Sequence, residues 1–247
     1  MLNMNIGYFA PSYKRPQKST TQKLYPFVKL VVKEDEAEEY KKNGNDIIVA
    51  PNEKQGNVCR IKNWILDEFL DQYDAIVLLD DDNTGIGRFE NQKWIQFNAE
   101  ELQEFSESHS VLCKDYNLYL WGLNCIPDKG AYREHTPFAI NVFIGAPFHC
   151  WMKGNELRYD EDLSLKEDYD ITLQNHLKYK GALRVNYASY KNKQSEQVGG
   201  CASYRNLERE KEQFYSLQRK WGGNIIKQDN SSRRSFDYNP IMKTFLK

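Results

Sequence analysis

The sequence lacks the features that mark membrane-spanning, secreted and zinc-finger proteins. No apolar run approaches the roughly 18 to 20 residues that a bilayer-spanning helix needs, and the N-terminus has no charged-then-apolar signal pattern. Cysteine is scarce: the five cysteines are odd in number and form no C-x-x-C pair, so neither a disulfide framework nor a zinc site is indicated. We therefore expect a cytoplasmic protein without membrane association.

A net charge is also almost lacking, because 34 Lys and Arg nearly balance 35 Asp and Glu. This balance hides an asymmetry along the chain. Residues 178–247 carry 15 Lys or Arg and 6 Asp or Glu (+9), whereas the remaining 177 residues carry 19 and 29 (−10). A basic C-terminal third could bind a polyanion or pack against the acidic body, and composition leaves both possibilities open.

Short apolar segments alternate with helix-like segments over the first hundred residues. Runs of β-branched and aromatic residues between turn formers predict strands at 5–10, 27–32, 46–50 and 75–79. Charge spacing predicts a solvated helix over 33–44. Between residues 56 and 74, apolar side chains recur three or four positions apart, which predicts an amphipathic helix. This βαβαβ-like order favours a mainly parallel sheet with helices on its faces.

The second half of the chain is less regular. Its residue patterns predict strands at 118–123, 138–146 and 183–190 and helices at 167–181 and 206–223. A polar tail without clear period follows. We expect an α/β fold with a mixed, mainly parallel central sheet flanked by helices. A single domain would span 1–247, with a nucleotide-binding half at 1–100, an acceptor and catalytic half at 101–225 and a C-terminal tail at 226–247.

Three aspartates, Asp80, Asp81 and Asp82, directly follow the apolar run 75–79 in "YDAIVLLDDDNTG". Three neighbouring carboxylates repel one another unless a cation lies among them, and oxygen ligands suit Mg²⁺ or Mn²⁺ holding a substrate diphosphate. The alternative is that they cap a helix or form an Asx turn. Receivers, dehalogenase-type phosphatases, nucleases and nucleotide-sugar transferases all place aspartates at strand ends. The first strand here ends in "APSYKRP" without a carboxylate, which argues against receivers and those phosphatases.

At this point the chain resembles the GT-A glycosyltransferases, and more narrowly the TET/J-binding-protein-associated glycosyltransferase family. The resemblance covers roughly residues 5–240 and lies in "APSYKRP", "CRIKNWIL", "LLDDDN", "LKEDYDITLQ", "GGCASYR" and "FDYNP". It implies a Rossmann-like GT-A fold and an enzyme, found in phages among other sources, that moves glucose or arabinose from a UDP-sugar to 5-hydroxymethylcytosine in DNA. Mn²⁺ or Mg²⁺ would be the cofactor, and a phage enzyme would work in the host cytoplasm.

The resemblance also implies roles for individual residues. Asp80 and Asp82 would contact the metal and the donor, and Asp81 would face the sugar. Residues from the first strand end and the amphipathic helix would line the donor nucleotide site: Pro11, Ser12, Arg15, Arg60 and Asn63. Arg60 could equally be an ordinary surface arginine of a helix.

The segment "KEDYD" supplies the remaining chemistry. A carboxylate can accept the proton of an attacking hydroxyl, so Asp168 or Asp170 is the candidate base and Glu167 a positioning residue. The alternative is that these acids only complement the dipole of a helix N-terminus.

Further residues could complete the metal and diphosphate sites. His149 could replace the late histidine ligand of many GT-A enzymes, although a lone histidine between Phe148 and Cys150 also suits a core position. Gly199, Gly200 and Arg205 could meet the diphosphate, although a Gly-Gly pair is also an ordinary turn.

Two other functions stay open at the level of sequence. The acceptor could be a protein or a polysaccharide instead of DNA. The chain could also be a non-catalytic module that binds DNA or protein on a transferase scaffold, which the clusters at 80–82 and 167–170 argue against.

Overall fold

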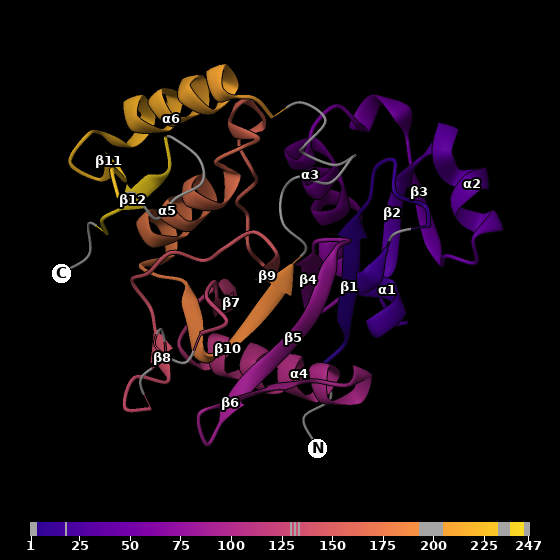
Figure 1. Ribbon diagram of the computed structural model, residues 1–247, viewed down its shortest axis with the longest axis horizontal. Helices are drawn as coiled ribbons and strands as arrows, with labels where there is room; N and C mark the ends of the chain where they lie inside the picture. Colours follow the sequence, from indigo (N-terminus) through magenta and orange to yellow (C-terminus); the bar gives the residue numbers. More distant parts are fainter. Residues whose placement is uncertain are drawn as a thin grey trace.

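A computed structural model describes residues 4–17, 19–128, 130, 132, 134–192, 205–231 and 238–244 (Figure 1). The strands are β1 (Ile6–Pro11), β2 (Lys29–Lys33), β3 (Ile47–Ala50), β4 (Ala75–Leu79), β5 (Asn83–Glu90), β6 (Lys93–Gln96), β7 (Leu120–Asn124), β8 (Phe138–Ala139), β9 (Phe148–Met152), β10 (Leu183–Asn192), β11 (Ile226–Gln228) and β12 (Pro240–Met242). The α-helices are α1 (Thr20–Leu24), α2 (Ala37–Lys42), α3 (Val58–Phe69), α4 (Ala99–Asp115), α5 (Glu167–Tyr179) and α6 (Leu207–Trp221).

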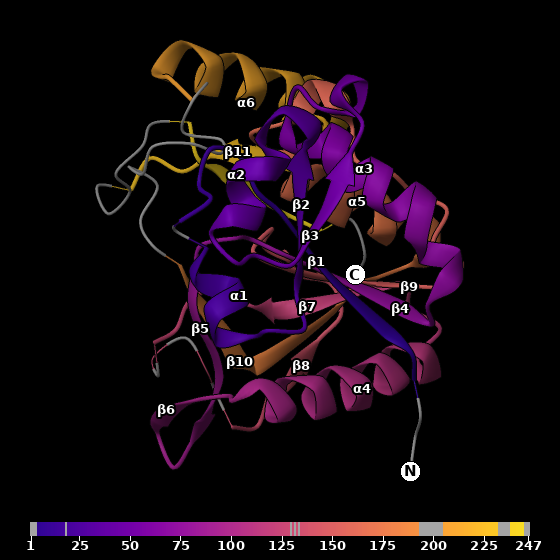
Figure 2. The ribbon, with the colours of Figure 1, turned by 90° about the vertical axis from the view of Figure 1, so that its right-hand side faces the viewer.

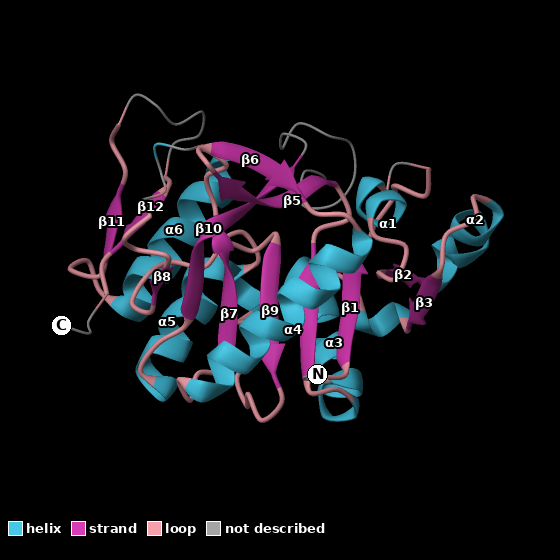
Figure 3. Ribbon diagram, turned by 90° about the horizontal axis from the view of Figure 1, so that it is seen from below, coloured by secondary structure: helices cyan, strands magenta, loops and turns pink. Residues whose placement is uncertain are grey.

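The central sheet has the strand order β3-β2-β1-β4-β9-β7-β10-β5-β6, and β8 pairs with β10 beside this path (Figure 3). All pairings among β3, β2, β1 and β4 are parallel. Strand β9 is antiparallel to both β4 and β7, and β10 is parallel to β7 but antiparallel to β5. The expected α/β fold with a mixed central sheet is confirmed, and its continuous parallel part is the N-terminal half.

The sheet lies between two helical layers because alternate side chains of a strand point to opposite faces. On β1, Tyr8 and Ala10 join the apolar cluster that α4 covers, whereas Phe9 joins the cluster that α3 and α5 cover. Figure 2 shows α4 below the sheet and α3 and α5 above it. Helix α6 and the β11–β12 hairpin pack on the outer side of α5, in a third cluster that includes Leu173 and Phe214.

Helix α3 places one charged residue on its buried face. The side chain of Asn57 caps the helix by accepting hydrogen bonds from the backbone N–H groups of Cys59 and Arg60, at 2.9 and 3.1 Å. Cys59, Lys62 and Leu66 are spaced three or four apart, and all three are buried. Arg60 is exposed on the opposite side. Lys62 is therefore the charged residue that α3 directs into the protein, next to the buried amide of Asn63.

Three segments differ from the sequence prediction. Only Phe138–Ala139 of the expected strand 138–146 joins the sheet, and the strand that pairs with β4 and β7 is Phe148–Met152. Both segments are apolar, but only Phe148–Met152 is hydrogen-bonded to a neighbouring strand on each side, β4 on one and β7 on the other. The sequence prediction also left residues 83–115 unassigned, where β5, β6 and α4 lie. The tail, expected to lack regular structure, contains the β11–β12 hairpin with Ile226 buried.

The chain reverses direction across the sheet beside β1, which positions the site. From β1 the chain builds β2 and β3 on one side, and it returns to form β4 on the other side. Phe9 of β1 lies opposite Leu78 of β4, so both strands end at the same edge. Open α/β sheets bind ligands at this kind of switch point. The described residues contain no helix with the length and apolarity needed to cross a bilayer.

Candidate active site

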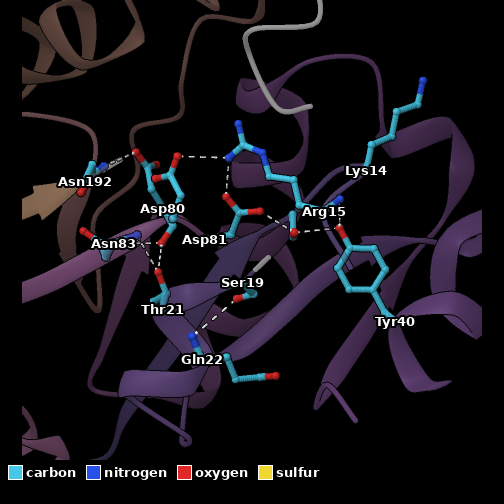
Figure 4. Close-up of polar contacts among 12 residues, drawn as sticks. Lys14, Arg15, Ser19, Thr21, Gln22, Tyr40, Asp80, Asp81, Asn83 and Asn192 are labelled. Atoms are coloured by element: carbon cyan, nitrogen blue, oxygen red, sulfur yellow. Dashed lines mark hydrogen bonds and ion pairs between the residues drawn. The ribbon is translucent and has the colours of Figure 1, made fainter. Parts of the chain in front are cut away.

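The carboxyl ends of β1 and β4 bring the residues after both strands together. Asp80, Asp81 and Asp82, called here the acidic rim, follow β4, and Ser12 and Arg15 follow β1. The hydroxyl of Thr21, in α1, donates to the backbone carbonyl of Asp80 at 2.6 Å. The sequence prediction grouped the strand ends correctly, since both contribute to one polar cluster (Figure 4).

Asp81 is the structural member of the acidic rim. The hydroxyl of Ser12 donates to its Oδ2 at 2.5 Å, and the guanidinium of Arg15 donates to its Oδ1 at 2.8 Å. Ser12 also bonds to the hydroxyl of Tyr40, which accepts the backbone N–H of Arg15 at 3.1 Å. Burial raises the pKa of Asp81, and the charge of Arg15 opposes that shift. The side chain of Asp81 thus lies against Ser12 and Arg15 of the β1 loop, and the expectation that it faces the sugar stays a prediction.

Replacing Asp81 by alanine is expected to lower the free energy of unfolding by about 3 kcal/mol, because the change leaves the buried guanidinium of Arg15 short of its main partner. The 3.2 Å contact between Arg15 and Asp82 would remain. Urea unfolding of Asp81→Ala measures this loss, and Asp82→Ala is the matched control. Equal losses in the two variants would show that Asp81 has no special structural role.

Asp80 and Asp82 carry charge that the fold does not fully offset. Burial raises the pKa of Asp80, with Lys62 opposing and Asp81 adding to the shift. Burial and the charges of Asp80 and Asp81 raise the pKa of Asp82 to about 7, with Arg15 opposing. Asn192, at the end of β10, donates from its amide to Asp80 Oδ2 at 3.1 Å. Burial and the neighbouring charges thus disfavour the ionised form of both carboxyl groups.

Two amide oxygens beside Asp80 lack partners within the described part of the chain. Asn83 and Asn192 are paired residues of β5 and β10. The amide nitrogen of Asn83 donates to the backbone carbonyl of Asp80 at 2.9 Å. Their Oδ1 atoms are buried without a hydrogen bond to any described residue. The corner around Asp80 thus offers neutral oxygen atoms in addition to carboxylates.

The first turn of α5 contributes the second acidic group. Glu167 is buried and accepts from the amino group of Lys62 at 3.3 Å. Asp168 is partly exposed, and its carboxylate accepts the backbone N–H of Tyr169 at 2.9 Å. Burial and the charge of Glu167 raise the pKa of Asp168 to about 7, and Lys62 and Lys166 oppose the shift. A carboxylate with this pKa is suited to accept a proton near neutral pH.

Asp170 faces the other way. Its Oδ1 accepts from the indole N–H of Trp221 at 2.7 Å and pairs with the amino group of Lys220 at 2.8 Å. Its Oδ2 accepts from Gln174 at 2.6 Å, and the residue is fully buried. Of the two candidate bases, Asp170 therefore joins α5 to α6, and Asp168 is the one that the structure leaves open to a substrate.

His149 does not fit the role of a metal ligand. The ring lies fully buried in β9, with Nδ1 at 2.8 Å from the hydroxyl of Tyr159 and Nε2 at 3.2 Å from the carbonyl of Ile144. Burial and the charge of Lys62 lower its pKa to about 3. Both ring nitrogens are used within the core, so the structure gives His149 the packing role that the sequence left as the alternative.

The side chains of Arg60 and Asn63 both pair with other residues of this chain. Arg60 pairs with Glu161 at 3.0 Å on the surface. The side chain of Asn63 accepts the backbone N–H of Tyr159 at 2.8 Å and donates to its carbonyl at 2.9 Å. These contacts fix the segment before α5 against α3. They do not support a direct contact of Arg60 or Asn63 with the nucleotide of the UDP-sugar.

The remaining predicted residues lie at the edges of the site. Pro11 is the last residue of β1. Arg205 precedes α6 and pairs with Glu210 at 2.7 Å. Gly199 and Gly200 lie outside the described residues, so their assignment stays a prediction.

Sequence reasoning missed three residues of this site. A lysine on a helix usually suggests solvent, but Lys62 repeats the spacing of buried Cys59 and Leu66, and that spacing is a usable signal. Asn192 and Tyr190 come from β10 and reach the site only through strand pairing. Tyr190 is buried, and the charges of Asp80 and Asp168 both contribute to raising its pKa.

Residues 8–200 match the model of a family described as TET-Associated Glycosyltransferase. The crystal structure of A197 from STIV matches with a TM-score of 0.43 and 12% identity, over 79% of this chain and 89% of that chain. The crystal structure of a mycobacterial protein matches with a TM-score of 0.49 and 9% identity, over 98% of this chain and 84% of that chain. No curated protein sequence matches the chain.

Proposed function

The chain belongs to the TET-associated glycosyltransferase family and is a glycosyltransferase; from this premise we propose that it moves a sugar from a UDP-sugar to the hydroxymethyl group of 5-hydroxymethylcytosine in DNA. The proposal is supported by the family match together with two acidic groups, one after β4 and one in the first turn of α5, on which the charge of Lys62 acts. Asp80 and Asp82 follow β4, and Asp168 opens α5 with a pKa of about 7. The carboxylates after β4 would bind the metal and the diphosphate of the UDP-sugar, and Asp168 would accept the proton of the acceptor hydroxyl.

The residues at the acidic rim fit a divalent cation. The described residues contain no group of three or more His, Cys, Asp or Glu side chains that could hold a metal ion, so the proposed cation would depend on two carboxylates and on oxygens of the substrate. Mg²⁺ and Mn²⁺ are commonly held by one or two carboxylates together with substrate phosphates. Asp80 and Asp82 would supply the carboxylates, and Asn192 would add a neutral oxygen. When bound, the metal would neutralise charge on the departing diphosphate.

The protein's own part in the reaction is to hold two substrates and move one proton. We assume an inverting transfer, in which Asp168 accepts the proton of the hydroxymethyl group as its oxygen bonds to the anomeric carbon of the sugar. The bond from that carbon to the diphosphate breaks, and UDP leaves. Tyr190, whose pKa responds to both Asp80 and Asp168, would lie near the UDP-sugar and the acceptor base. Asp81, Ser12 and Arg15 would fix the β1 loop that borders the nucleotide.

Charge and DNA geometry support a DNA acceptor. The basic C-terminal third carries exposed Arg219 and Lys227 on α6 and β11. Lys220 in the same region is partly used by Asp160 and Asp170, and Arg233 and Arg234 lie outside the described residues. Phosphate contacts by basic residues dominate DNA affinity at low salt. A substituent at the 5-position of a pyrimidine projects into the major groove, where an enzyme can reach it.

The test is nucleoside mass spectrometry of DNA that contains 5-hydroxymethylcytosine. We expect a mass gain of one sugar residue on the modified base after incubation with Mn²⁺ and one of UDP-glucose, UDP-arabinose or UDP-N-acetylglucosamine. DNA with unmodified cytosine is the control and should stay unchanged. Transfer to a protein or glycan without any gain on DNA would replace the proposed acceptor. The absence of both transfer and UDP binding would favour a non-catalytic module.

A further inference from the structure

Lys62 is a lysine held almost entirely away from solvent. Its side chain is 2% exposed, and its amino group lies 3.3 Å from Glu167 Oε1. The same amino group lies over the ring of Tyr159, 5.2 Å from the ring centroid. Burial opposes its charge, but Glu167, Tyr159 and Asp80 outweigh burial and raise its pKa. Lys62 is therefore a buried lysine whose charged form is favoured by its partners.

This cation joins the two acidic groups of the proposed active site. Lys62 comes from α3, which covers the parallel half of the sheet, and Glu167 opens α5 in the second half of the chain. Its charge also acts on Asp80 at the end of β4 and on Asp168. A single ammonium group thus pairs with Glu167 and acts through its charge on Asp80, assigned to the donor, and on Asp168, assigned to the acceptor.

We infer that Lys62 is a positioning residue of the proposed reaction: its buried ammonium group holds Glu167 and thereby fixes the first turn of α5, which carries Asp168. This inference rests on the proposed function, because it assigns Asp168 as the base. Lys62 is too deeply buried to contact a substrate itself. It acts through Glu167 by contact and through the electric field on Asp168.

Stability alone does not account for this pair. Replacing a buried ion pair with well-packed apolar residues is often neutral or stabilising, so a helix–helix contact needs no lysine at this position. The pair lies beside a partly exposed carboxylate, where its charges alter proton affinity. The charged and titratable groups that act on Asp168 come from α3, the segment before α5, α5 itself, the end of β7, and β10: Lys62, Lys166, Glu167, Cys125 and Tyr190.

The experiment follows the carboxyl carbon of Asp168 by NMR titration of the whole protein without substrate, with Asp168→Asn used to assign the signal. In Lys62→Met, Glu167 loses its ion pair, and the charge of Lys62 no longer opposes the raised pKa of Asp168. We expect the upper titration midpoint of this carboxylate pair to rise by about one pH unit or more. Lys62→Arg keeps the charge and should return the midpoint toward that of the wild type.

A double variant keeps the test decisive if Lys62→Met does not fold. Lys62→Met with Glu167→Gln removes both charges, and the midpoint should then fall, because Glu167 raises the proton affinity of Asp168 more than Lys62 lowers it. Lower thermal stability with an unchanged midpoint in every variant would overturn the inference and leave Lys62 a packing residue. Because the titration needs no substrate, failure of sugar transfer would count against the proposed function and not against this one.

Discussion

Replacement of Asp168 by asparagine is expected to lower kcat for sugar transfer by about 10²–10⁴-fold, the usual contribution of a general base. The amide cannot accept the proton of the acceptor hydroxyl. The donor should bind as before, because Asp80 and Asp82 follow a different strand and stay intact. Steady-state kinetics with a saturating UDP-sugar, combined with calorimetric titration of UDP, separates these two effects.

The wild-type pH profile should carry the signature of the same residue. The base must be ionised, and the pKa of Asp168 is about 7, so the rate should rise with pH up to about 7 and then level off. Asp168→Asn should lose this limb. The matched control is Asp170→Asn, two positions further along α5, where Lys220 and Trp221 are the partners. That variant should lose thermal stability and keep the pH profile. The reverse outcome would exchange the roles of the two aspartates.

The raised pKa of Asp168 also predicts a dependence of stability on pH. A carboxyl group whose folded pKa lies above its ordinary value near 4 binds its proton more tightly in the folded state. Its contribution to stability is complete below about pH 4 and is lost as the pH rises through about 7. Asp168→Asn removes this loss. Differential scanning calorimetry should therefore show a higher Tm for the variant than for the wild type at pH 8, and a smaller difference at pH 5.

The parallel half of the fold could be predicted well from the sequence, because its strands and helices have strong local patterns of apolar residues. The strand at 75–79 is apolar throughout and buried on both faces, and α3 has clear helical spacing. Residues 83–115 were missed although α4 has a capping box formed by Asn98 and Glu101, which is a readable signal. The choice between 138–146 and Phe148–Met152 could not be made locally, since only strand pairing distinguishes two neighbouring apolar runs.

The site was predictable in its residue types and much less in its geometry. Aspartates after β4 and acids opening α5 were recognisable because both are dense in charge. Which acid faces the substrate depends on rotation about α5, and that rotation is set by α6, about 50 residues later in the chain. Likewise, the sequence suggested Arg60 and Asn63 as ligands of the donor nucleotide, whereas Arg60 lies on the surface and Asn63 is buried beside Lys62. Long-range packing decides such questions, and local sequence does not encode it.

The three aspartates of the acidic rim are expected to respond differently to substitution, and Asp80 should show the largest functional effect. Asp80→Asn removes a buried charge that burial and Asp81 disfavour, while its side chain can still bond to Asn192. We expect the metal-free Tm to rise by about 3 °C, corresponding to about 1 kcal/mol. Transfer should fall by at least about 10²-fold, because a metal supplies several kcal/mol of stabilisation to a departing diphosphate.

The response of Tm to Mn²⁺ separates this result from simple damage to the fold. Wild-type protein should gain stability when Mn²⁺ and UDP are added together, since ligands that bind only the folded state raise Tm. Asp80→Asn should lose this gain despite its higher starting Tm, and Asp81→Ala should keep part of it despite a lower one. If Asp80→Asn retained the full gain, the cation would have to bind elsewhere. The carboxylates of the acidic rim would then serve the contacts that the structure already shows, with Arg15 for Asp81 and Asp82 and with Asn192 for Asp80.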